Sequence, residues 1–108
     1  MTTPHQRRKL ELEAMRGLVA DLDAFVKTTT VGTVPATEVA DAFERHTAGL
    51  PPDSQVLAQF RDLAVRLRHG PARTRVEGIR QIARKLRLKA DEFAQIVEAR
   101  DAKLQGKG

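Results

Sequence analysis

The chain has 108 residues, enough for one small domain with a single core and too few for two. With 41% hydrophobic and 31% charged residues, it has the composition of a globular protein. The absence of cysteine excludes disulfides, thiolate nucleophiles and thiolate metal sites. No apolar run approaches the roughly 18 residues of a spanning helix. We therefore expect an uncleaved, non-secreted, cytoplasmic protein without a membrane partner.

Charge is distributed unevenly along the chain. Between Leu10 and Phe60 there are three Lys and Arg against eight Asp and Glu, whereas Arg61 to Lys89 contains ten Lys and Arg against two Asp and Glu. The net charge is +5. Such a basic block attracts nucleic acid, anionic lipid or an acidic protein, unless it packs against the acidic half or is simply solvated.

The first predicted element is a helix over residues 4–27. Thr3, Pro4 and Gln6 form the pattern of a capping box with proline at the first helical position. One apolar stripe then recurs at helical spacing, formed by Leu12, Met15, Leu18, Val19, Leu22, Phe25 and Val26. Residues 28–35 are rich in β-branched side chains and contain Gly32 and Pro35, so we expect an extended linker, or a short strand without an obvious partner.

Two further helices are predicted in the middle of the chain. Pro35 begins a short helix that buries Val39 and Phe43 and ends near Gly49. Asp53 or Ser54 caps the next helix, which stops at Gly70 and Pro71. Its apolar line comprises Leu57, Phe60, Leu63, Ala64 and Leu67.

No alternating run long enough for a sheet is present, so the predicted fold class is all-α. We expect a compact bundle of four to five helices that forms one domain over residues 1–108. The segments 1–3 and 106–108 are expected to fray.

The segment 72–105 allows two interpretations. As one long helix it carries a heptad seam suited to pairing with another helix, formed by Val76, Ile79, Ala83, Leu86, Ala90, Phe93 and Val97. This interpretation leaves Leu88 outside the seam.

If the chain instead bends after Leu86, residues 81–97 resemble a helix-turn-helix unit, with Leu88 filling the turn and Ile82, Ala83, Leu86, Phe93 and Ile96 packing the two helices. Arg87 then stands where this family commonly has glycine. The resemblance implies that the second helix enters a DNA major groove and presents Lys89, Ala90, Asp91, Ala94 and Gln95.

A basic ridge is predicted on the preceding helix, where Arg73, Arg80, Arg84 and Arg87 project within about 60° of one another. Their guanidinium groups suit phosphate oxygens. The expected nucleic-acid-binding residues are Arg73, Arg80, Arg84, Lys85, Arg87, Lys89 and Gln95. Gly78 indicates either a close helix approach or a gap tolerated by packing.

The sequence gives little basis for catalysis. His5, His46 and His69 are scattered, with no paired-ligand spacing and no glycine-rich phosphate loop. We expect neither an enzyme, nor a cofactor, nor a metal site, and interpret His46 as a residue at the edge of the core.

Two functions remain open. The first is a small DNA-binding protein of regulatory or mobile-element type that acts as a homodimer. The second is a helical interaction module, an adaptor or inhibitor, whose 76–97 seam or basic face binds an acidic protein partner.

Overall fold

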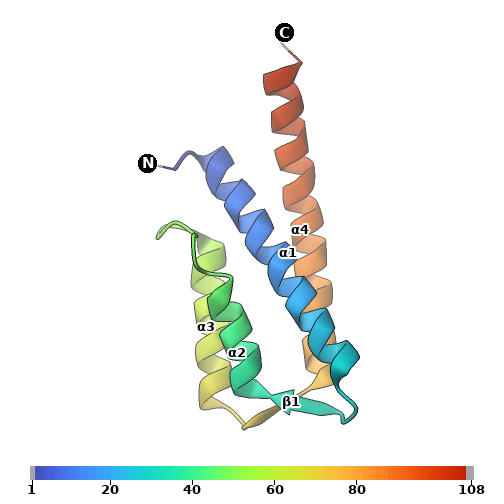
Figure 1. Ribbon diagram of the computed structural model, residues 1–108. Coiled ribbons are helices and arrows are strands. Elements are labelled where there is room, and N and C mark those ends of the chain that lie inside the picture. The colour runs from blue at the N-terminus through green and yellow to red at the C-terminus, as the bar shows by residue number, and fades with distance from the viewer. Residues whose placement is uncertain (1, 107–108) are drawn as a thin grey trace.

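The computed structural model describes residues 2–106, which form four helices and one short two-stranded sheet (Figure 1). The order is α1 (Pro4–Thr28), β1 (Thr33–Pro35), α2 (Ala36–Arg45), α3 (Gln55–His69), β2 (Arg73–Arg75) and α4 (Val76–Gln105). The prediction of a mostly helical chain is confirmed. The molecule is elongated, with extents of 54 × 26 × 15 Å. The predicted frayed ends include residues 1, 107 and 108, which lie outside the described residues.

The predicted helix starts are confirmed where a side chain caps them. The Thr3 hydroxyl accepts a hydrogen bond from the Gln6 backbone N–H at 3.1 Å, and the Gln6 side chain accepts one from the Thr3 N–H at 3.1 Å. At the start of α3, the Ser54 hydroxyl accepts from the Leu57 N–H at 3.2 Å. These bonds satisfy donors that lack partners inside the helix.

The predicted linker 28–35 contains the short strand β1, and this strand has a partner that the sequence did not indicate. β1 and β2 pair antiparallel, with Val34 opposite Thr74. Two backbone bonds of 2.9 Å flank the ladder, from the Ala36 N–H to the Ala72 carbonyl and from the Val76 N–H to the Gly32 carbonyl. Strands of three residues are too short to show an alternating pattern. The pairing joins two units of the same order, α1–β1–α2 and α3–β2–α4, and Val34 and Thr74 form its central residue pair.

The core is built from two helix pairs. α4 packs along α1, and α2 packs against α3 (Figure 1). The rings of Phe43 and Phe60 meet edge to face, with centroids 5.5 Å apart. The His46 ring lies against Gly17 and its Nε2 is 2.7 Å from Asp21 Oδ2, so its predicted position at the core edge is confirmed. Among residues 2–106 no helix combines the length and apolar character needed to cross a bilayer.

The predicted helix-turn-helix bend was wrong, because α4 is one uninterrupted helix. Residues 86–90 contain neither Gly nor Pro, and the strong helix formers Leu, Arg, Lys and Ala occupy them. Within the described chain, positive φ occurs at Gly49 alone, so Arg87 makes no tight corner. Leu88 is consequently 62% exposed instead of filling a turn.

The straight-helix interpretation of the 76–97 seam is confirmed. Ile79, Ala83, Ala90 and Val97 are buried, and Leu86 and Phe93 are partly buried against the same core. The seam packs along α1 of the same chain and is therefore not available to another protein. Gly78 has no atom within 4 Å of the position a Cβ would take, which excludes the predicted close approach.

A candidate binding groove between α3 and α4

The predicted arginine ridge does not form one phosphate surface. Arg73 lies in β2, where it donates from Nε to the Thr33 hydroxyl at 2.8 Å and also bonds the Thr33 carbonyl. Arg80 pairs with Glu77 at 2.7 Å. Arg87 pairs with Asp23 of α1. Three of the four ridge arginines are thus engaged within the chain, Arg73 by β1, Arg80 by Glu77 of α4 itself and Arg87 by α1.

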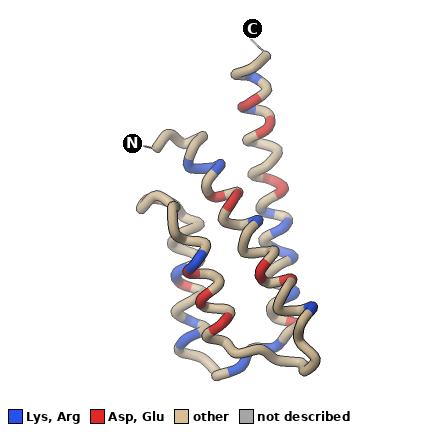
Figure 2. Tube along the Cα trace, viewed as in Figure 1, with Lys and Arg blue, Asp and Glu red and all other residues tan. Residues whose placement is uncertain are grey.

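The remaining predicted site residues, Arg84, Lys85, Lys89 and Gln95, are exposed on α4. Within residues 2–106, Arg84, Lys85 and Lys89 make no ion pair. Figure 2 shows Lys and Arg gathered along the β2-proximal half of α4. The predicted recognition face does not stand free, since Ala90 and Ala94 are buried. It therefore cannot enter a DNA groove in the predicted way.

The most distinctive concave surface lies between α3 and α4, beside β2. A cavity of about 510 Å³ opens there, with Leu63 and Leu67 of α3 and Ile82 of α4 on its apolar side. Each of these side chains is only partly buried, because α3 and α4 do not close over them.

Cations form the rim of this cavity. Arg66, Arg73 and Arg75 line it, and no carboxylate is among its lining residues. Arg66 is held at 3.1 Å by Asp62, one turn earlier on α3, whereas Arg75 makes no ion pair with any residue in the described range 2–106. The cavity therefore combines an apolar floor with net positive charge.

A second depression, of about 370 Å³, lies at the other end of the same two helices. Val56 and Gln59 of α3 and Phe93 and Lys89 of α4 contribute to it, and the Arg8 guanidinium lies 5.9 Å from the centre of the Phe93 ring. Gln59 is one helical turn from Leu63, so the two separate depressions lie on the same face of α3. We call the two depressions together the α3–α4 groove, formed by Val56, Gln59, Leu63, Leu67, Ile82, Lys89 and Phe93.

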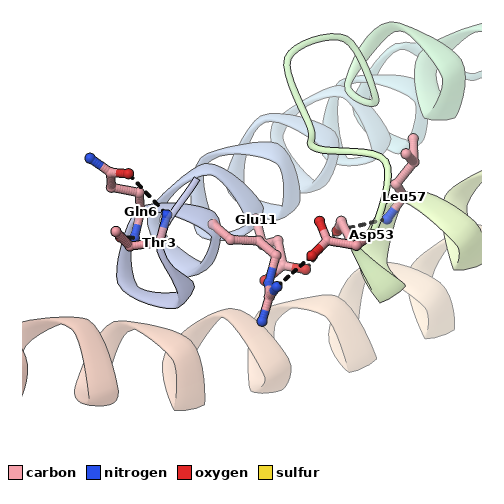
Figure 3. A network of polar contacts seen from close by, with 7 residues as sticks. Thr3, Gln6, Glu11, Asp53 and Leu57 are labelled. Carbon is pink, nitrogen blue, oxygen red and sulfur yellow. Dashed lines mark hydrogen bonds and ion pairs between the residues drawn. The ribbon is translucent and has the colours of Figure 1, made fainter. Parts of the chain in front are cut away.

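A polar network fixes the start of α3 against α1 and so sets one end of the groove (Figure 3). The buried Ser54 hydroxyl, which caps α3, donates to Glu11 Oε2 at 2.6 Å. Arg7 of α1 pairs with Asp53 at 2.8 Å. Glu11 is buried, and its carboxylate is satisfied by this contact.

Two carboxylates of the acidic half, Asp41 and Glu44, are engaged away from the groove, whereas Glu11 and Asp53 line the depression at its other end. Arg68 bonds Asp41 at 2.6 Å and Glu44 at 3.0 Å, on the α2 side of α3. The hydrogen bond from Arg68 lowers the pKa of Glu44 below its usual value. Since these carboxylates bind Arg68, they do not neutralise Arg66 or Arg75 on the groove rim.

The loops that join α1 to α2 and α3 to α4 do not suit a calcium ion, although each unit has the helix–loop–helix order of an EF-hand. Gly32 and Glu38 have the Gly-x5-Glu spacing of such a loop, but Lys27, Thr29 and Val31 stand where that pattern requires carboxylate or amide oxygens. The second loop is cationic, with Arg73 and Arg75. Among the described residues, no cluster of His, Asp and Glu could hold a metal ion.

Compared with protein-family models, with curated proteins and with solved structures, the chain matches none of them. Function therefore has to be inferred from the geometry of this chain alone.

Proposed function

We propose that this protein is an interaction module that binds an acidic, amphipathic helix of a partner protein in the α3–α4 groove. The proposal rests on the cavity between α3 and α4, beside β2. Its floor is apolar, with Leu63, Leu67 and Ile82, and its rim has three arginines and no carboxylate. Amphipathic helices dock into such grooves through apolar residues at i, i+3, i+4 and i+7. Acidic residues on the same helix would meet the arginine rim, which favours acidic partners over basic ones.

The groove has the length of a short helix. From Val56 to Leu67 α3 rises roughly 16 Å at 1.5 Å per residue, which corresponds to about three turns. A partner helix of three to four turns would place one apolar residue beside Ile82 and another beside Phe93. Of the two surfaces expected for an interaction module, the 76–97 seam is buried on α1 and the arginine ridge is mostly engaged within the chain. The proposed contact instead uses Arg66 and Arg75, which are exposed. We propose that the module acts in the cytoplasm.

A designed peptide tests the proposal, because it reproduces the two features that the groove requires, an apolar stripe and acidic residues. A fluorescein-labelled 16-residue peptide with Leu at helical spacing and Glu elsewhere should give saturable fluorescence anisotropy. A scrambled peptide of the same composition should not. Arg66→Glu combined with Arg75→Glu should weaken binding at least tenfold, and Arg61→Glu, on the side of α3 away from the groove, should leave it unchanged. Absence of saturable binding, or equal loss with Arg61→Glu, overturns the proposal.

DNA binding is the second candidate, and the exposed cations Arg84, Lys85 and Lys89 favour it. The contact would be to phosphates along straight α4, in a regulatory or mobile-element protein acting as a homodimer. Because phosphate binding releases counterions, affinity for random duplex DNA should fall steeply with salt. Gel shifts at two salt concentrations test this, and binding that does not change with salt, or no binding, excludes it.

A further inference from the structure

The face of α4 that points away from α1 has an ordered charge pattern. Its residues are all exposed and fall within about 120° of one another at 100° per residue. They are Gln81, Arg84, Lys85, Leu88, Asp91, Glu92 and Gln95. Leu88, which is 62% exposed, lies at the centre. We call these seven residues the outer face of α4.

The pattern is self-complementary when the helix is reversed. Two cations lie one turn before Leu88, two carboxylates lie one turn after it, and a glutamine ends each side. In an antiparallel pair of identical helices centred on Leu88, Arg84 of one copy faces Glu92 of the other, and Lys85 faces Asp91. Parallel pairing would instead place like charges together.

We propose that a second copy of this chain binds the outer face of α4, in an antiparallel arrangement with a two-fold axis at Leu88. Such a contact is isologous, because each copy supplies the same patch. The two leucine side chains cover one another, and four intermolecular ion pairs surround them. Because both patches are used in the contact, the assembly stops at a dimer and cannot extend into a filament.

No carboxylate of α4 lies at pairing distance from Arg84 or Lys85, whereas Asp91 and Glu92 follow Arg87 and Lys89 by four and three residues. On a helix, ion pairs form between residues three or four apart. At those distances from Arg84 and Lys85 the sequence has Arg80, Gln81, Ile82, Arg87, Leu88 and Lys89, and none of these is acidic. In the part of the chain that the structure describes, neither Arg84, Lys85, Asp91 nor Glu92 makes an ion pair.

This inference does not depend on the proposed groove. Ile82, Lys89 and Phe93 face the groove, whereas the outer face lies on another side of α4 and shares no residue with it. A dimer could therefore form without peptide binding, and peptide could bind a monomer.

A charge-exchange experiment tests the proposal. One variant carries Arg84→Glu and Lys85→Glu, and a second carries Asp91→Lys and Glu92→Lys. In sedimentation equilibrium at roughly millimolar loading, suited to a small interface, the wild type should be dimeric and each variant alone monomeric. An equimolar mixture of the two variants should recover dimer. Circular dichroism checks that each variant keeps its helices.

A control variant with the same charge change separates specific pairing from net charge. Arg16→Glu with Arg61→Glu alters two exposed cations, on α1 and α3, that line no cavity with the outer face, and this variant should still dimerise. A monomeric wild type, a dimer that survives in either variant alone, or a mixture that stays monomeric overturns the proposal. If the first variant loses DNA binding and the mixture does not regain dimer, Arg84 and Lys85 serve phosphate contacts instead.

Discussion

Replacing Ser54 with alanine should destabilise the protein more than the loss of a surface hydroxyl. Ser54 is 3% exposed, and its hydroxyl both accepts from the Leu57 N–H and donates to Glu11. Loss of an N-cap costs about 0.5–2 kcal/mol. A buried carboxylate left without its donor adds about 1–3 kcal/mol. Because the two losses share one atom they do not add fully, and we expect roughly 2–3 kcal/mol for Ser54→Ala.

Equilibrium unfolding in urea measures this effect. With a slope of about 1–2 kcal/mol per molar urea, the midpoint should fall by roughly 1–3 M. Glu11→Gln retains an acceptor for the Ser54 hydroxyl and should cost less than about 1 kcal/mol. Ser54→Asp keeps a capping oxygen but places a second carboxylate beside Glu11, so it should also destabilise. A Ser54→Ala midpoint within about 0.3 M of wild type would refute the reasoning, since neither bond would then contribute to stability.

Three further predictions follow from the packing and the ion pairs. Leu88→Lys should change the unfolding free energy by less than about 0.5 kcal/mol in urea denaturation at low protein concentration, because the side chain is exposed. A loss of about 2–4 kcal/mol, roughly that of a buried leucine, would instead support the bent helix. Gly17→Ala should cost about 1–3 kcal/mol in thermal or urea unfolding, because the new Cβ would lie 2.7 Å from the His46 ring; an unchanged midpoint would mean that the ring is not packed there. The hydrogen bond from His5 lowers the pKa of Asp101 below its ordinary value of 3.8. The contribution of this carboxylate to stability is therefore present at neutral pH and is lost as the pH falls below 3.8. Asp101→Asn should lower the urea midpoint more at pH 7 than at pH 3, and an equal loss at both would contradict the assignment.

The helix positions could be predicted from sequence because their signals are local. Thr3, Pro4 and Gln6 act on one another within a single turn, and Ser54 caps the residue three positions later. The bond from Ser54 to Glu11 joins residues 43 positions apart, and no pattern near either residue indicates it.

The shape of α4 could not be decided from sequence. The same apolar residues satisfy a bent helix pair and a straight seam, and the choice depends on what covers Ala83 and Ala90. Since α1 covers them, the straight form buries more apolar surface, and Leu88 is left in solvent. A periodic seam shows that a helix is covered but does not identify its partner.

The candidate groove could not be predicted from the sequence either. Leu63 and Leu67 were predicted as part of a buried line, but the lower end of α3 stands apart from α4 and they remain half-covered. The β1–β2 pairing beside the cavity also could not be detected, because its strands have only three residues each.

The pairing of α1 with α4 has a consequence for biosynthesis. The residues from Thr29 to Arg75 separate these helices, whereas α2 and α3 are adjacent in the chain. Closing the long loop between α1 and α4 costs more conformational entropy than closing the short loop between α2 and α3. The α2–α3 pair can therefore form before α1 is covered. During translation the apolar stripe of α1 emerges from the ribosome well before its covering helix is made, and it is in this interval that a nascent chain is most open to chaperones and to aggregation.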